Sequence, residues 1–261
     1  MLALSHLISY PLVGVLAGLA IGLTGMGGGV LLTPIMVLVL KVPANVAVSN
    51  DLLISLIVKP FGTVAHQRAG TVRRDIVLRL VVGSVPAAFV GAVLANTALD
   101  GDVGALKTMI GVTLLLSAAA MALRMVVRRE RHTVGAAKVM SAHLTAATGA
   151  IGVIGGVLVG ITSVGSGSLM LVLLTWLHPR LTSRELVGTD LAQAIPLVAS
   201  AVLGHLIFGD IRMSIVLPVV LGAIPGVLVG SRFSSRMPDG ALRPVLTVLV
   251  GASGLRLAGL I

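Results

Sequence analysis

Ten long runs of apolar residues follow one another along the chain, and short polar segments separate them. The runs are long enough for helices, and the alternation of apolar and polar residues that marks a membrane β-strand is absent. The pattern predicts helices over residues 5–23, 28–40, 46–67, 75–97 and 104–126. It predicts a second set over 140–161, 166–177, 186–208, 214–232 and 240–259. We therefore expect an all-α polytopic integral membrane protein.

Composition supports lipid as the surrounding solvent. Charged residues make up 11% of the 261 residues and hydrophobic residues 56%, whereas a soluble domain carries about 25% charged residues. The net charge of +10 does not indicate nucleic acid, because the basic residues lie in short segments between apolar runs and aromatic residues make up only 2%. We expect a lipid bilayer as partner and no nucleic acid.

The two sets of helices repeat one pattern at an offset of 138 or 139 residues. The matching positions are glycines, prolines and polar residues, and they include Gly22 with Gly160, Asp51 with Asp190, His66 with His205, and Pro86 with Pro225. The sequence predicts a first repeat over 1–126, a basic cytoplasmic linker over 127–139 and a second repeat over 140–261, all within one transmembrane domain. Duplicated, glycine-interrupted hydrophobic chains are typical of secondary transporters.

Basic clusters predict how the repeats insert. They lie at residues 68–74, 124–138, 180–184 and 232–243, and the positive-inside rule puts all four in the cytoplasm. The loop after the third helix is then inside in the first repeat and outside, around Asp210, in the second. The prediction is two repeats of inverted topology with both termini outside.

A glycine-rich break joins the first and second helices of each repeat. The second helix is about 20 Å long, against about 30 Å of hydrocarbon, so each pair either crosses twice or enters and leaves on one side. Broken backbone in a membrane faces protein or a water-filled cavity, and each break opens a helix whose N-terminus favours an anion. The alternative is close helix packing through small residues. The predicted substrate-binding residues here are Thr24, Gly25, Gly27, Gly28, Gly29, Thr162, Ser163, Gly165, Ser166 and Gly167.

The motif Gly-x-x-Gly-x-Gly-Gly-Gly over residues 22–29, followed by Pro34 and Asn50-Asp51, with a second copy at 160–167, resembles the TauE/SafE family of sulfite exporters. The resemblance covers nearly the whole chain. It implies a multi-pass protein of the bacterial inner membrane that exports sulfite, an organosulfonate or another small anion. The second copy has Ser163 and Ser166 where the first has Gly25 and Gly28.

Three charged residues lie within the predicted apolar helices. Asp51 and Asp190 each begin a third helix, where an acid either caps the helix N-terminus or takes part in coupling or gating. Lys59 follows near mid-span, where a cation that faces a cavity would bind an anion. Alternatively, a bend at Pro60 lets Lys59 reach an interface, or pair with Asp51 or Asp75. Its counterpart is Val198, so one half alone supplies this cation.

Two histidines complete the candidate set. His66 and His205 align with each other, seven residues after Lys59 and Val198, and either exchange protons in coupling or gating or bond to backbone at an interface. Gln67 and Gln193 are weaker candidates for lining a polar path.

The residues favour a secondary transporter that exports a small anion by alternating access, and not an enzyme. We expect no metal or cofactor, because no His, Asp and Glu cluster has metal-ligand spacing, no P-loop occurs and no serine has a base at usable spacing. The alternative function is a proton- or cation-coupled permease for another small solute that uses Asp51 and Asp190. The sequence leaves the substrate and the oligomeric state open, a homo-oligomer included.

Overall fold

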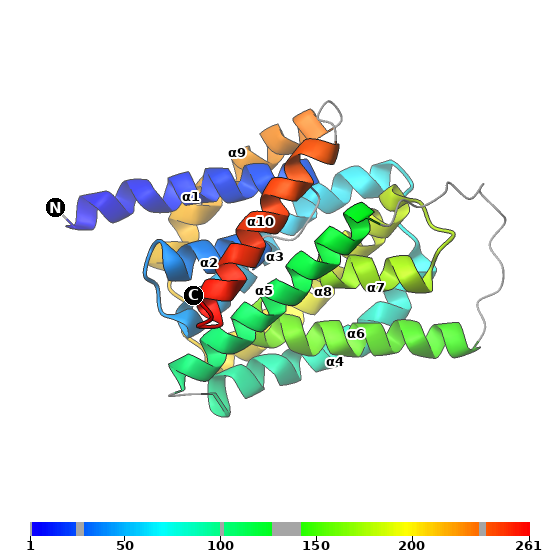
Figure 1. Ribbon diagram of the computed structural model, residues 1–261, viewed down its shortest axis with the longest axis horizontal. Coiled ribbons are helices and arrows are strands. Elements are labelled where there is room, and N and C mark those ends of the chain that lie inside the picture. Colours follow the sequence, from blue (N-terminus) through cyan, green and yellow to red (C-terminus); the bar gives the residue numbers. More distant parts are fainter. Residues whose placement is uncertain (1, 25–28, 100–101, 127–141, 235–238) are drawn as a thin grey trace.

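A computed structural model of the chain describes residues 2–24, 29–99, 102–126, 142–234 and 239–261, which form ten helices (Figure 1). The helices are α1 (Leu2–Thr24), α2 (Gly29–Leu38), α3 (Ala44–Arg68), α4 (Arg74–Thr97), α5 (Val103–Val126), α6 (Ala142–Thr162), α7 (Leu169–Leu177), α8 (Ser183–Phe208), α9 (Met213–Ser234) and α10 (Asp239–Leu257). All ten predicted helices are present, and their ends agree within three residues. The linker predicted over 127–139 lies outside the described residues.

Six of these helices, α3, α4, α5, α6, α8 and α9, are long and apolar enough to cross a membrane. This confirms the expected all-helical, multi-pass fold. The short second helices differ from the rest, because α2 has ten residues and α7 has nine. At about 1.5 Å per residue each covers roughly half of a hydrocarbon core of about 30 Å. Length therefore argues against a full crossing by either short helix.

Glycines bring two pairs of helices into backbone contact. An ideal Cβ on Gly18 of α1 would lie 2.3 Å from the carbonyl oxygen of Ala223 on α9. An ideal Cβ on Gly160 of α6 would lie 2.3 Å from the carbonyl oxygen of Ala88 on α4. Small residues let membrane helices approach this closely. Since α1 corresponds to α6 and α9 to α4 in the duplication, the same packing occurs twice, on opposite sides of the bundle (Figure 1).

The equivalent helices α3 and α8 cross at the centre and run in opposite directions. Ser49, near the start of α3, contacts His205, near the end of α8, and Thr63 near the end of α3 lies 3.4 Å from the carbonyl oxygen of Leu191. Both helices are largely buried between the α1–α9 and α4–α6 pairs. This crossing positions the polar residues of the candidate site. How the repeats insert relative to the two membrane faces stays a prediction.

Candidate functional site

The second glycine break lies against the start of α2 inside the protein. An ideal Cβ on Gly29, the first residue of α2, would lie 1.9 Å from the carbonyl oxygen of Ser163, the residue that follows α6. No side chain fits between these two backbones. Ser163, Gly165 and Gly167 have φ angles of 58°, 119° and 98°, so the chain between α6 and α7 turns sharply while it stays buried. The break of the second half therefore forms one site with the start of α2.

Asp51 joins three segments at this site. Its carboxylate accepts hydrogen bonds from Thr33 Oγ1 of α2 at 2.5 Å, from Ser163 Oγ at 2.8 Å and from Ser55 Oγ at 3.4 Å. Asp51 is fully buried in the second turn of α3, which begins at Ala44. The prediction that Asp51 begins its helix as a cap is therefore wrong. The three hydroxyl donors replace the water that the carboxylate gives up on burial.

Lys59 lies two turns further along α3 and is 3% exposed. Its Nζ atom donates a hydrogen bond of 2.8 Å to Ser166 Oγ in the second glycine break. Asp190 and Asp51 both lie within electrostatic reach of the ammonium. Because α3 continues through Pro60 to Arg68 and Lys59 stays buried, the alternative in which Lys59 reaches an interface is wrong.

Four polar residues form a stripe on one face of α3. Asp51, Ser55, Lys59 and Thr63 recur every fourth residue, the spacing of one helix face, and each is at most 4% exposed. The equivalent face of α8 begins with Asp190 and continues with apolar residues at 194, 198 and 202. The polar stripe therefore belongs to the first half alone.

A hydroxyl without a partner lies at the start of α7. Ser168 occupies the N-cap position and is 2% exposed, and its Oγ makes no hydrogen bond within the described part of the chain. A serine at this position ordinarily accepts from a first-turn amide. Several donors therefore meet at the buried segment before α7. They are the Ser168 hydroxyl, the N-terminal end of α7 and the Lys59 ammonium that is bonded to Ser166. Donors of this kind suit an oxyanion.

Asp190, the counterpart of Asp51, lies on α8 and is held by a neighbouring glutamine. It is 1% exposed and accepts a hydrogen bond of 3.1 Å from Gln193 Nε2. Gln193 also contacts Met170 Sδ at 2.9 Å and accepts from Ser84 Oγ of α4 at 3.4 Å. Since α8 begins at Ser183 and is capped by Thr182, the prediction that Asp190 caps this helix is wrong as well.

We call the buried polar residues Asp51, Ser55, Lys59, Asp190 and Gln193 the polar cluster. At one end of the polar cluster, Asn50 binds the loop between α8 and α9. Its Oδ1 accepts a hydrogen bond of 2.8 Å from the backbone N–H of Arg212, and its Nδ2 donates to the carbonyl oxygen of Asp210 at 3.2 Å. Asn50 is fully buried beside Asp51. We call this the Asn50 end, defined by Asn50 and residues 209–212.

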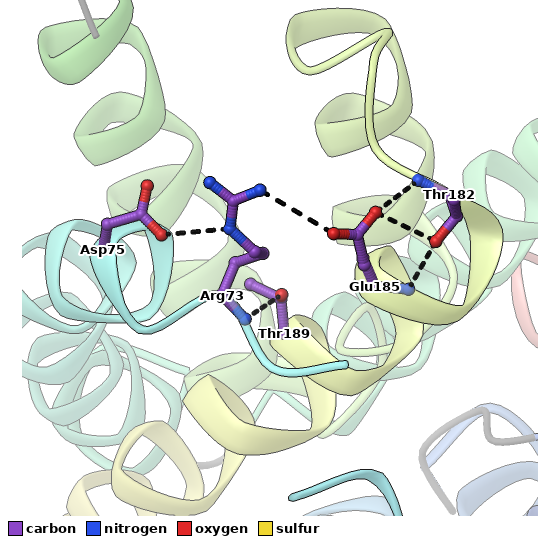
Figure 2. Close-up of polar contacts among 5 residues, drawn as sticks. All are labelled: Arg73, Asp75, Thr182, Glu185 and Thr189. Atoms are coloured by element: carbon purple, nitrogen blue, oxygen red, sulfur yellow. Dashed lines mark hydrogen bonds and ion pairs between the residues drawn. The ribbon is translucent and has the colours of Figure 1, made fainter. Parts of the chain in front are cut away.

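At the opposite end, Thr189 binds the loop between α3 and α4 in the equivalent way. Its Oγ1 accepts a hydrogen bond of 3.1 Å from the backbone N–H of Arg73 (Figure 2). The Arg73 guanidinium lies between two acids, 3.4 Å from Asp75 and 3.7 Å from Glu185. We call this the Thr189 end, defined by Thr189 and residues 69–73. Basic loops at 68–74 and 180–184 thus lie at one end, as a common cytoplasmic face requires.

His205 is hydrogen-bonded through both ring nitrogens. Nε2 lies 2.9 Å from the carbonyl oxygen of Gly160, which only accepts, so Nε2 carries the proton. Nδ1 accepts at 2.9 Å from Asn96 Nδ2, because an amide nitrogen only donates, and it lies 2.8 Å from Ser49 Oγ. The network therefore assigns a neutral ring that ties α8 to α3, α4 and α6. A coupling role for His205 stays a prediction.

The remaining predicted residues divide into three groups. Gly25, Gly27 and Gly28 lie outside the described residues, and so do the side chains of Thr24 and His66. Thr162 bonds locally to Leu158 and Val164 and closes the end of α6. Gln67 is exposed. The structure brings Gly29, Lys59, Ser163, Ser166 and Asp51 together.

Sequence reasoning did not select Thr33, Ser55, Thr63 or Ser84. The fourfold spacing from Asp51 to Ser55, Lys59 and Thr63 was available in the sequence as a signal. Thr33 and Ser84 carried none, because only the packing of α2 and α4 against the central helices brings them close.

Comparison with known proteins gives a family and two relatives. The sequence model of the family described as "Sulfite exporter TauE/SafE" matches residues 10–257. The chain is similar to the "Probable membrane transporter protein YjnA" of Bacillus subtilis, with 34% identity over 96% of this chain and 99% of that protein. It is also similar to the "Probable membrane transporter protein YdhB" of the same organism, with 28% identity over 94% and 98%. No solved structure gives a significant match.

Proposed function

Because the chain belongs to the sulfite exporter TauE/SafE family of membrane transporters, we propose that it exports a small anion, such as sulfite or an organosulfonate, by alternating access. Membership makes it a multi-pass protein of the bacterial cell membrane, in agreement with the six described helices that are long and apolar enough to cross a membrane. The anion, the direction of transport and the mechanism are our proposal.

The contact between Lys59 and Ser166 carries this proposal. Among the described residues, the buried ammonium is hydrogen-bonded to a neutral hydroxyl alone, and it can exchange that bond for a charge-assisted one to an anion. Ser168 supplies a second hydroxyl that has no hydrogen-bond partner among the described residues. An oxyanion at this position would meet Lys59 Nζ, the two serine hydroxyls and the N-terminal end of α7.

The location supports transport rather than fixed binding. The site is formed by both halves, since Lys59 belongs to the first and Ser166 to the second. Polar residues continue from it to both ends of the bundle, through Asp51 to Asn50 and through Asp190 to Thr189. Relative movement of the halves would carry an anion between these ends. An interior-negative membrane potential drives an anion outward at about 2.3 kcal/mol per charge per 100 mV.

Efflux from proteoliposomes tests this function. Purified protein is reconstituted around radiolabelled sulfite, and an outward driving force is applied with a potassium diffusion potential. We expect efflux with the wild type and its loss with Lys59→Ala at equal protein content. Efflux that Lys59→Ala leaves unchanged removes Lys59 from the site, and absence of efflux for sulfite, thiosulfate and taurine-derived anions contradicts anion export.

A second function rests on the two buried carboxylates. Asp51, with three hydroxyls around it, and Asp190, bonded to Gln193, could bind a proton or another cation that drives uptake or export of a different solute. The paired substitution Asp51→Asn with Asp190→Asn separates the two functions. It should abolish transport by a cation-binding permease, whereas an anion exporter should keep transport with an altered pH dependence.

A further inference from the structure

Each half of the protein holds a loop of the other half through one buried side chain. Asn50 on α3 accepts from the backbone N–H of Arg212, and Thr189 on α8 accepts from the backbone N–H of Arg73. In the duplication Asn50 corresponds to Thr189 and Arg212 to Arg73. The two contacts are therefore equivalent and reciprocal, although an amide makes one and a hydroxyl makes the other.

The contacts lie at opposite ends of the polar cluster. Asn50 directly precedes Asp51 and Thr189 directly precedes Asp190, and all four side chains are at most 1% exposed. Because α3 and α8 run antiparallel, the two loops lie at opposite ends of the crossing. Each loop thus separates one buried carboxylate from the exterior at its own end.

We propose that Asn50 and Thr189 are positioning residues of the transport cycle, each holding the loop that closes one end of the polar cluster, and that the two contacts break in alternation. This inference rests on the proposed transport function. In the structure both contacts are made, so the cluster is closed at both ends. Opening of one end while the other contact persists would give an outward-open or an inward-open state.

The two contacts differ in what reinforces them. At the Asn50 end, Asn50 also donates to the Asp210 carbonyl, while Arg212 and Asp210 pair within their own loop at 2.6 Å. At the Thr189 end, the guanidinium of Arg73 reaches across to Glu185 of the other half (Figure 2). Asn50 therefore makes two bonds to its loop, beside the contacts of His205 with Ser49 and Asn96, while Thr189 makes one bond and shares its end with an ion pair. Loss of Asn50 should have the larger effect.

Side-specific labelling tests the alternation. The chain contains no cysteine, so a single Ser55→Cys substitution beside Asp51 gives one reporter thiol. A membrane-impermeant thiol reagent is applied to right-side-out and to inside-out membrane vesicles. The variants are Asn50→Ala and Thr189→Val, and Thr189→Ser restores the hydroxyl. Ser200→Ala is the matched control, because Ser200 on α8 donates a buried inter-half bond of 2.6 Å to Val85 away from both ends.

We expect Asn50→Ala, which loses two part-buried hydrogen bonds to the loop, to raise the labelling rate in right-side-out vesicles by about tenfold or more and to leave inside-out vesicles unchanged. Thr189→Val should do the reverse, by a smaller factor, and Thr189→Ser and Ser200→Ala should match the parent. Three results would overturn the inference. They are a labelling rate that rises from both sides in either variant, a rate that changes in neither variant, and an equal rise in Ser200→Ala.

A second pair of variants covers failure of the buried substitutions to fold. Arg212→Pro and Arg73→Pro remove the donating N–H from the loop side, at positions that precede a helix and tolerate proline. Arg212→Pro should raise labelling from the same side as Asn50→Ala, and Arg73→Pro from the same side as Thr189→Val. If the protein exports sulfite but thiol labelling shows no side preference in any variant, the alternation is overturned and transport is supported. Side-specific labelling without efflux of any tested anion supports the alternation and contradicts the proposed function.

Discussion

Lys59 and Ser166 are bonded across the two halves of the protein, with Nζ 2.8 Å from Oγ. The duplication does not reproduce this pair, because the equivalent positions hold Val198 and Gly28. The site is therefore asymmetric although the fold is repeated. One half supplies the cation and the other supplies the hydroxyl, so neither half holds the site alone.

Substitution of Ser166 tests how this pair acts. In Ser166→Ala the ammonium loses its only hydrogen bond among the described residues, and the anion loses one donor. We expect the KM for export to rise by about tenfold or more, the effect of one hydrogen bond to a charged group. Flux at varied substrate concentration measures this. Ser231→Ala, which removes an exposed serine hydroxyl on α9, is the control, and equal KM values for the two variants would contradict the role of Ser166.

A pair of glycine substitutions tests the contact between the start of α2 and the second glycine break. Gly29→Ala would place a Cβ 1.9 Å from the Ser163 carbonyl oxygen, whereas Gly149→Ala on α6 meets nothing within 4 Å. We expect Gly29→Ala to destabilise the protein by about 1–3 kcal/mol. Gly149→Ala should be neutral or stabilise by up to about 1 kcal/mol, because alanine favours a helix. Thermal unfolding in detergent measures both, and equal stability would contradict the close approach.

The start of α8 gives a local prediction that is independent of transport. Thr182 and Glu185 form a capping box, in which each side chain bonds to the backbone N–H of the other (Figure 2). Thr182→Ala should cost about 1 kcal/mol of stability. Glu185→Gln keeps an acceptor and loses only the half-exposed pair with Arg73, so it should cost less than about 0.5 kcal/mol. A larger loss for Glu185→Gln than for Thr182→Ala would contradict this ranking.

His178 predicts a dependence of stability on pH. Burial lowers the pKa of this imidazole, and the nearby Asp75 carboxylate opposes the shift only in part. Its Nε2 lies 3.0 Å from Thr148 Oγ1. Since the folded pKa is below the unfolded value of 6.5, the neutral ring stabilises the fold. This contribution is complete above that value and is lost as the pH falls through the folded pKa. The thermal midpoint should fall less between about pH 7 and pH 5 in His178→Gln than in the wild type. Equal slopes would contradict this account.

The fold was predictable to the level of single helices, because lipid requires continuous apolar segments that end at polar loops. The error at Asp51 has a specific cause. Asp51, which follows Asn50, reads as an acid at the beginning of the helix predicted from residue 46, whereas α3 begins at Ala44. Val46 and Val48 are buried, so packing determines the helix there in spite of the low helix propensity of valine.

The site was predictable only where the residues lie close in sequence. Glycine breaks indicated Ser163 and Ser166, and an unusual charge indicated Lys59, but their contact joins residues 107 positions apart. Asp51 and Ser163 are separated by 112 positions. Pairing at such distances depends on how α3 crosses α8 and on how the second break packs against α2, and apolar periodicity specifies neither.

Equilibrium binding tests whether Lys59, bonded to Ser166 of the second glycine break, binds the anion. Purified wild type and Lys59→Met, matched in thermal stability, are titrated with radiolabelled sulfite in a scintillation proximity assay. We predict saturable binding to the wild type, and a loss of at least about tenfold in affinity in Lys59→Met. Equal affinity of the two proteins for sulfite would contradict it.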